Sequence, residues 1–158
     1  MSQLTVSPVS LQEIARIAVL QSHIEGCLAL VVTNLSGVPE PTGDALTKAM
    51  SLRTLVEVVR SLVAPRLPAG DPDGAYLLQA VKDASAVAQE RNAIVHSMRG
   101  FGSDFGPGTS TRVRVEGFPP SPESAPVTLF ELHALAEKME AILSMLVYLH
   151  PNMKRSGL

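Results

Sequence analysis

The sequence predicts an all-α protein: a four-helix up-and-down bundle with a short β-hairpin or loop insertion before the last helix. Three observations favour this class. Apolar residues recur at three- and four-residue steps along four segments of the chain. Only 4% of the 158 residues are aromatic and none is tryptophan, so aliphatic side chains must build the core. Hydrophobic residues make up 46%, which is enough for one folded domain over residues 1–158.

The first helix is expected from Ser10 to about Ser36. Ser10 and Glu13 have the spacing of a capping box, in which each side chain binds the other residue's backbone N–H. The apolar stripe that follows is Ile14, Ile17, Ile24, Leu28, Val32 and Leu35. Two prolines and two glycines in residues 36–44 predict a loop after this helix.

The second and third helices are separated by a stretch of prolines and glycines. The second is expected over about residues 45–64, because Pro65 and Pro68 follow it. Asp71, directly before Pro72, supplies a helix cap. The third helix is therefore expected from there to about Met98.

Residues 99–127 are rich in Gly, Pro and Ser and form the predicted insertion. Within them, "TRVRVEG" (111–117) alternates polar and apolar residues as a short strand does, and Phe101–Phe105 is one candidate partner strand. Thr128 and Glu131 form a second capping box, which opens a last helix to about Tyr148. Residues 151–158 are expected to be a frayed tail.

Composition also excludes several classes of protein. The net charge of −2 argues against a protein that binds nucleic acid by overall charge alone. The single cysteine, Cys27, cannot form an intrachain disulfide or a thiolate metal cluster. We expect its side chain to be buried as a small apolar group. Residues 1–10 have no basic region followed by an apolar block, so we expect no secretory signal, and the longest apolar run, residues 27–32, is too short to span a bilayer. We therefore expect a soluble, cytoplasmic protein with no membrane association.

Three polar side chains interrupt the apolar pattern near the end of the third helix: Arg91, Asn92 and His96. Asn92 and His96, four residues apart, share a helix face, whereas Arg91 lies about 140° from His96 and reaches it only through its long side chain. A histidine flanked by a guanidinium and an amide can bind a phosphate and exchange protons near neutral pH. The alternative is a solvated polar stripe.

Glu25 is a carboxylate on the apolar face of the first helix. A buried carboxylate needs a partner, and an arginine from a facing helix is the usual one. Arg91 is the first candidate and Arg53 the competitor. In this structural alternative, the pair ties two helices together and carries no chemistry.

The segment "ERNAIVHS" (90–97) resembles the RNxxxH signature of HEPN-type domains. The wider layout is similar to uncharacterised bacterial members of that kind. It has an inward glutamate in "SHIEGCLALVV", a second helix with "LRTLVEVV", a glycine-rich hairpin after the histidine and a closing helix that starts with "TLFEL". The resemblance implies a metal-independent endoribonuclease without a cofactor, whose sites form across a homodimer.

The resemblance also implies roles for the motif residues. His96 would be the general acid or base, Arg91 would stabilise the phosphorane-like transition state, and Asn92 would orient the scissile phosphate or the histidine. The ribose 2′-hydroxyl would attack the adjacent phosphate and leave a cyclic phosphate. The sequence has no HxxxH or HExxH motif and no Asp-rich loop, so no metal site is expected. His23, His133 and His150 are scattered, and we expect surface or satisfied histidines there.

The insertion supplies candidate RNA contacts. Residues 91–114 hold four arginines against one aspartate, and Arg99, Arg112 and Arg114 are the RNA-contacting candidates. Phe101 and Phe105 lie between them and could stack on bases. A solvated hairpin with ordinary exposed arginines is the alternative. "GFGSDFGPG" (100–108) lacks the GxGxxG spacing, and we expect a turn region there.

A homodimer is expected because segments such as "AILSMLVYL" and "CLALVV" are more apolar than the outer faces of a small bundle require. An RNA substrate and an antitoxin-like partner protein complete the enzyme hypothesis. The alternative is a non-catalytic dimeric helical bundle, in which the motif is structural or binds a nucleotide or a partner protein.

Overall fold

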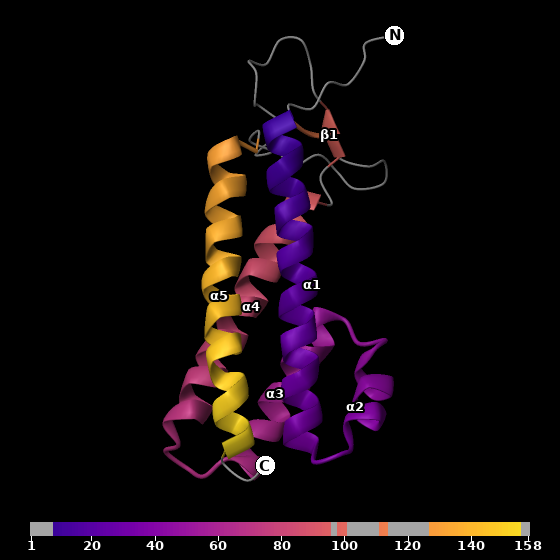
Figure 1. The fold of residues 1–158 in the computed structure, drawn as a ribbon. Helices are drawn as coiled ribbons and strands as arrows, with labels where there is room; N and C mark the ends of the chain where they lie inside the picture. The colour runs from indigo at the N-terminus through magenta and orange to yellow at the C-terminus, as the bar shows by residue number, and fades with distance from the viewer. Residues whose placement is uncertain (1–7, 96–97, 101–110, 114–126, 156–158) are drawn as a thin grey trace.

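The computed structural model describes residues 8–95, 98–100, 111–113 and 127–155. Most of these residues are helical, and the predicted all-α class is confirmed. The described helices are α1 (Pro8–Ser36), α2 (Glu40–Thr47), α3 (Leu52–Arg66), α4 (Pro72–Val95) and α5 (Leu129–Arg155) (Figure 1).

The helix α2 lies where the sequence predicted a loop. Gly37 ends α1 with a φ of 70°, which favours glycine, and its N–H donates to the Asn34 carbonyl at 3.2 Å. Pro39 and Pro41 do not block α2, because prolines are tolerated at a helix start, where the missing N–H is not needed. The Pro-rich composition of this segment therefore marks a helix start, and the prediction of a loop was wrong.

The extra helix changes the direction of the long helices. Arg66, at the end of α3, donates to the carbonyl of Ser36, at the end of α1, so these two helices run parallel. Glu13 and His133, near the starts of α1 and α5, also meet, so α1 and α5 are parallel too. In an up-and-down bundle α1 would be antiparallel to both neighbours. In Figure 1 the chain passes back along the bundle through α2 before α3 begins, so α3 runs in the same direction as α1. The predicted up-and-down arrangement is therefore wrong for α1.

The four long helices enclose one aliphatic core. Helix α1 packs against α3 and α5, while α4 contacts α3 and α5 on the other side. The Lys138–Glu90 ion pair and the Tyr76–Tyr148 ring contact show that α4 and α5 are antiparallel. The largest fully buried side chains are Ile24, Leu28, Val31, Leu35, Leu55, Val59, Leu77, Leu132, Leu135, Met139, Leu146 and Leu149. The prediction of an aliphatic core is confirmed.

The helix caps agree with the sequence only in part. The Thr128–Glu131 capping box forms, since the N–H of Thr128 donates to Glu131 Oε2 at 2.7 Å and the N–H of Glu131 donates to Thr128 Oγ1 at 3.2 Å. Asp71 caps α4 through the N–H of Gly74 at 3.0 Å. The predicted Ser10–Glu13 box is wrong, because α1 already begins at Pro8 and Ser10 is buried within it.

Two predicted helix boundaries also move. Helix α3 starts at Leu52, after Ser51 accepts a capping hydrogen bond from the N–H of Thr54 at 3.3 Å, and not near residue 45. Helix α4 is described to Val95, and residues 96–97 lie outside the described residues. Helix α5 continues to Arg155, so residues 151–155 are helical although Pro151 cannot donate its backbone hydrogen bond.

Two short strands follow α4. Strands β1 (Met98–Gly100) and β2 (Thr111–Val113) pair antiparallel, with Arg99 opposite Arg112. Strand β2 lies in the alternating segment that the sequence singled out. Its partner directly follows α4, whereas the candidate Phe101–Phe105 lies outside the described residues.

By length and composition, α1 would also pass as a membrane-spanning helix. Its most apolar 18-residue window has a mean hydropathy of 1.4, and 28% of that window is buried. The run at residues 27–32 is only the longest uninterrupted apolar part of this helix. In the structure α1 packs against α2, α3 and α5.

Candidate functional site

Arg91 lies on the core-facing side of α4. The buried residues of this helix include Val87 and Ile94, four residues before Arg91 and three after it. Arg91 itself is half-buried, and its Nε atom is fully buried without a hydrogen-bond partner among the described residues. Its Nη1 donates to Oδ1 of Asn92 at 3.0 Å. The helix thus places a guanidinium where an apolar side chain would complete the core.

Asn92 lies on the adjacent face of α4 and is exposed. It lines a groove of about 460 Å³ between α3 and α4. The polar residues along this groove are Arg53, Glu57, Arg60, Ser85, Gln89 and Asn92. The motif therefore joins a half-buried cation to an open polar groove.

Glu25 does not pair with either predicted arginine. It is half-buried and accepts a hydrogen bond from the side-chain amide of Gln21, one turn earlier, at 2.8 Å. The described residues contain no Glu25–Arg91 ion pair, and Arg53 instead pairs with Glu57 at 3.2 Å on an exposed surface. The prediction was wrong because partial exposure and a neighbouring amide satisfy the carboxylate without a cation.

The remaining predicted site residues are described incompletely or not at all. His96, Arg114, Phe101 and Phe105 lie outside the described residues. Arg99 and Arg112 are direct backbone partners across the β1–β2 pair. The structure therefore brings Arg91 and Asn92 together and gives no position for the histidine.

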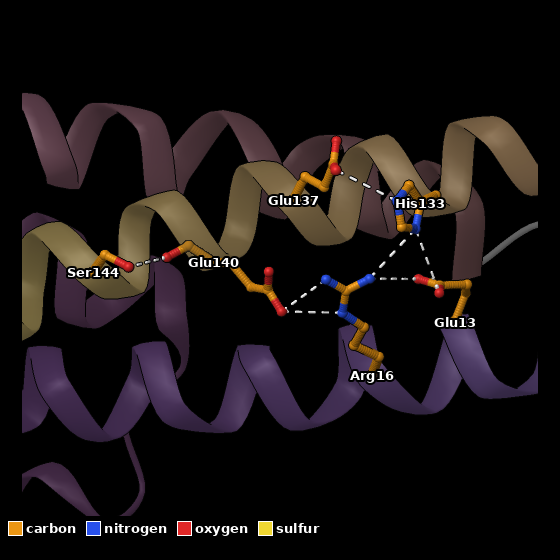
Figure 2. A network of polar contacts seen from close by, with 6 residues as sticks. All are labelled: Glu13, Arg16, His133, Glu137, Glu140 and Ser144. Carbon is orange, nitrogen blue, oxygen red and sulfur yellow. Dashed lines mark hydrogen bonds and ion pairs between the residues drawn. The ribbon is translucent and has the colours of Figure 1, made fainter.

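A second polar cluster, which the sequence did not predict, joins α1 to α5. Arg16 contacts Glu140 Oε1 through Nη2 at 2.8 Å and through Nε at 3.1 Å. Its Nη1 lies 3.2 Å from Glu13 Oε2 and 3.4 Å from His133 Nδ1. Figure 2 shows the guanidinium between these groups, with Glu137 on the far side of the histidine. We refer to Glu13, Arg16, His133, Glu137 and Glu140 as the α1–α5 clasp.

The clasp is an ion-pair network. The hydrogen bond to Glu140, followed by the weaker effect of Glu13, raises the pKa of Arg16 above its ordinary value, although desolvation opposes this. In the described part of the chain, no three His, Cys, Asp or Glu side chains are placed to hold a metal ion. The three- and four-residue spacings of Glu13–Arg16 and His133–Glu137 were visible in the sequence. Their contact across two helices was not, because it depends on α1 and α5 being parallel.

No family model matches this sequence, and neither a curated protein nor a solved structure matches it. The chemistry of the site is therefore inferred from its own residues.

Proposed function

We propose that this protein is a metal-independent endoribonuclease of HEPN type that uses Arg91, Asn92 and His96. The observation that carries the proposal is that the charge of Arg91 is not paired with a carboxylate among the described residues. Its half-buried guanidinium has no carboxylate partner among the described residues, and its buried Nε has no acceptor there. An arginine kept only for stability would be expected to have its charge paired, because an unpaired buried cation is costly. An anionic ligand such as a phosphate supplies the missing partner.

The proposed reaction needs two proton transfers and one cation. The ribose 2′-oxygen attacks the adjacent phosphorus and loses its proton to a base, while the leaving 5′-oxygen gains a proton from an acid. His96 performs one of these transfers. Arg91 stabilises the charge that develops on the phosphoryl oxygens. The products are a 2′,3′-cyclic phosphate and a free 5′-hydroxyl.

The geometry of Asn92 is compatible with its part in this reaction. Its Oδ1 already accepts from Arg91, which leaves the Nδ2 donors for a phosphoryl oxygen. The same hydrogen bond restrains the guanidinium. Asn92 would thus orient both the substrate and the catalytic cation.

The proposal includes a four-helix bundle of HEPN type, with residues 99–127 as an insertion, that acts as a cytoplasmic homodimer. A dimer is supported by large apolar side chains that stay exposed on α5, Val147 at 56% and Tyr148 at 63%. Tyr148 packs edge-on against Tyr76 of α4, with ring centroids 6.1 Å apart. Such a rigid aromatic pair on an outer face suits a protein interface. Arg99, Arg112 and Arg114 would contact the RNA, and an antitoxin-like protein would be a second partner.

A second candidate function is a non-catalytic dimeric module. The Arg91–Asn92 hydrogen bond favours it, since two neighbouring motif side chains that satisfy each other can serve to fix the end of α4. In that case the motif would bind a nucleotide or a partner protein, or only stabilise the helix end.

The test compares the wild-type protein with His96→Ala on single-stranded RNA in the presence of a chelator. The proposal predicts cleavage by the wild type, with 2′,3′-cyclic phosphate ends detected by mass spectrometry. It predicts a rate for His96→Ala about 10²- to 10⁴-fold lower. Products that carry 3′-hydroxyl ends, or equal rates for the two proteins, would contradict the mechanism.

A further inference from the structure

We propose that the groove between α3 and α4 binds the RNA strand next to the scissile phosphate, with Arg53 and Arg60 holding its phosphates. This inference rests on the proposed function and assigns a path for its substrate. It starts from one connection: Asn92 belongs both to the motif and to the lining of this groove.

Two polar ridges face each other across the groove. On α3, Arg53, Glu57 and Arg60 follow at steps of four and three residues, so they share one helix face. On α4, Ser85, Gln89 and Asn92 follow the same steps. Arg53 and Arg60 are seven residues apart, which places them about 10 Å apart along the helix axis. The groove thus presents two separated cations opposite a row of neutral hydrogen-bonding groups.

Hydrogen-bond donors exceed acceptors along the groove. Arg53 uses Nε on Glu57 at 3.2 Å, which leaves its other guanidinium donors. Neither Arg60 nor Gln89 has a side-chain hydrogen bond or ion pair to another described residue. Glu57 is the one carboxylate among the described lining residues, against two arginines. A donor-rich groove with a positive balance suits an anionic ligand.

The groove is also extended along the helices. A neighbouring cavity of about 400 Å³ adjoins it at Arg60, towards the start of α4, but that cavity is lined mainly by apolar side chains and includes the carboxylate of Asp71. Within the groove itself, two arginines about 10 Å apart along α3 suit a chain with repeated charges better than a single anion. The described lining residues include no aromatic side chain, so no base-stacking platform lies there. Binding should therefore depend on phosphates and salt more than on base identity.

The experiment measures RNA binding separately from cleavage. A fluorescently labelled 12-nucleotide oligouridine is titrated with full-length His96→Ala protein, and anisotropy is followed between 50 and 200 mM salt. Adding Arg53→Ala and Arg60→Ala should weaken binding roughly tenfold. The slope of log affinity against log salt should fall in magnitude by about 0.7 for each lost contact. Glu57→Gln should tighten binding about two- to fivefold, because it removes the groove's carboxylate.

Lys82→Ala is the control for losing a positive charge outside the groove. It removes one positive charge from an exposed position of α4 that does not line the groove, so its effect should be much smaller. Circular dichroism checks that each variant keeps its helices. Weaker binding by the Arg53/Arg60 variant alone supports the groove, even if the wild type cleaves no RNA. Equal effects of that variant and Lys82→Ala would overturn it while leaving the proposed catalysis intact. Failure of the His96→Ala protein to bind the oligouridine would also overturn it.

Discussion

Arg91 donates from Nη1 to Oδ1 of Asn92 at 3.0 Å, and the described structure contains no ion pair between Arg91 and Glu25. The guanidinium at the core-facing side of α4 is therefore restrained by its neighbour in the motif and not by a carboxylate on α1. The stability of the fold should therefore not depend on the charge of Arg91. The contributions of Arg91 to stability and to activity can be measured separately.

Replacing Arg91 with methionine should leave the free energy of unfolding within about 1 kcal/mol of the wild type. Methionine keeps the apolar stem and removes a buried donor that has no acceptor. Glu25→Gln should change stability by less than about 0.5 kcal/mol, since the site is half-buried and its partner is an amide.

Urea unfolding of the two single variants and the double variant measures the coupling. It should be zero within about 0.5 kcal/mol, as for residues that do not touch. A loss of about 3 to 5 kcal/mol for Arg91→Met would instead mean that a buried ion pair had been broken.

Gly43 of α2 should not tolerate a side chain. A Cβ there would lie 2.7 Å from the Cβ of Thr33 on α1 and closer still to that residue's Oγ1 and Cγ2. We expect Gly43→Ala to lower the free energy of unfolding by about 1 to 3 kcal/mol, as overpacking does.

Gly26 is the matched control, because it lies within α1 and a Cβ there would meet no atom within 4 Å. Gly26→Ala should stabilise the protein by about 0.5 to 1 kcal/mol through helix propensity. Equal responses of the two glycine variants in thermal unfolding would show that α2 is not packed on α1 as described.

Cys27 should make stability fall at alkaline pH. Burial raises the pKa of its thiol above the ordinary value of 9.0. Between the unfolded and folded pKa values the native state keeps a proton that the unfolded state has lost, so rising pH favours unfolding. The contribution is fully present below about pH 8.5 and is lost as pH rises above it.

The measurement is the difference in unfolding free energy between the wild type and Cys27→Ala from pH 7 to pH 10.5. The comparison with Cys27→Ala cancels the titration of lysine and tyrosine. The difference should be constant up to about pH 8.5. At higher pH the unfolding free energy of the wild type should fall relative to that of Cys27→Ala. A flat difference over the whole range would show that the thiol is no more buried in the native state than in the unfolded state.

The α1–α5 clasp should contribute to stability in a salt-dependent way. Arg16→Met removes contacts to Glu13, Glu140 and His133 together, whereas Arg53→Met removes one exposed pair. The melting temperature should therefore fall more for Arg16→Met, and the difference should shrink in 1 M NaCl because salt screens ion pairs. Equal melting temperatures at low salt would mean that the clasp does not hold α1 to α5.

The helix pattern could be predicted because it depends on local periodicity. The spacing of the apolar residues located the long helices, and the Thr128–Glu131 capping box marked the start of α5 to within a residue. The short α2 was missed because an eight-residue helix, with one proline at its N-cap and another in its first turn, is too short to show an apolar stripe in the sequence. Missing it also reversed the expected direction of α3 and α5 relative to α1.

In the candidate site, only contacts between residues that are adjacent in the sequence could be predicted. Arg91 and Asn92 meet because they are adjacent on one helix. The Glu25–Arg91 pair was predicted between two helices. Periodicity shows which face of a helix a residue lies on, but not its position along the axis of the bundle. The α1–α5 clasp and the α3–α4 groove both depend on this position, which the sequence does not give.

The most direct test of the account is the single-turnover rate of RNA cleavage in the presence of a chelator, measured together with stability. The wild type, Arg91→Met and His96→Ala are compared on the same single-stranded RNA. We expect both variants to keep a melting temperature close to that of the wild type while their cleavage rates fall about 10²-fold or more. A wild type that leaves RNA intact, with motif variants that unfold at much lower temperature, would contradict the account and assign the motif to the stability of the bundle.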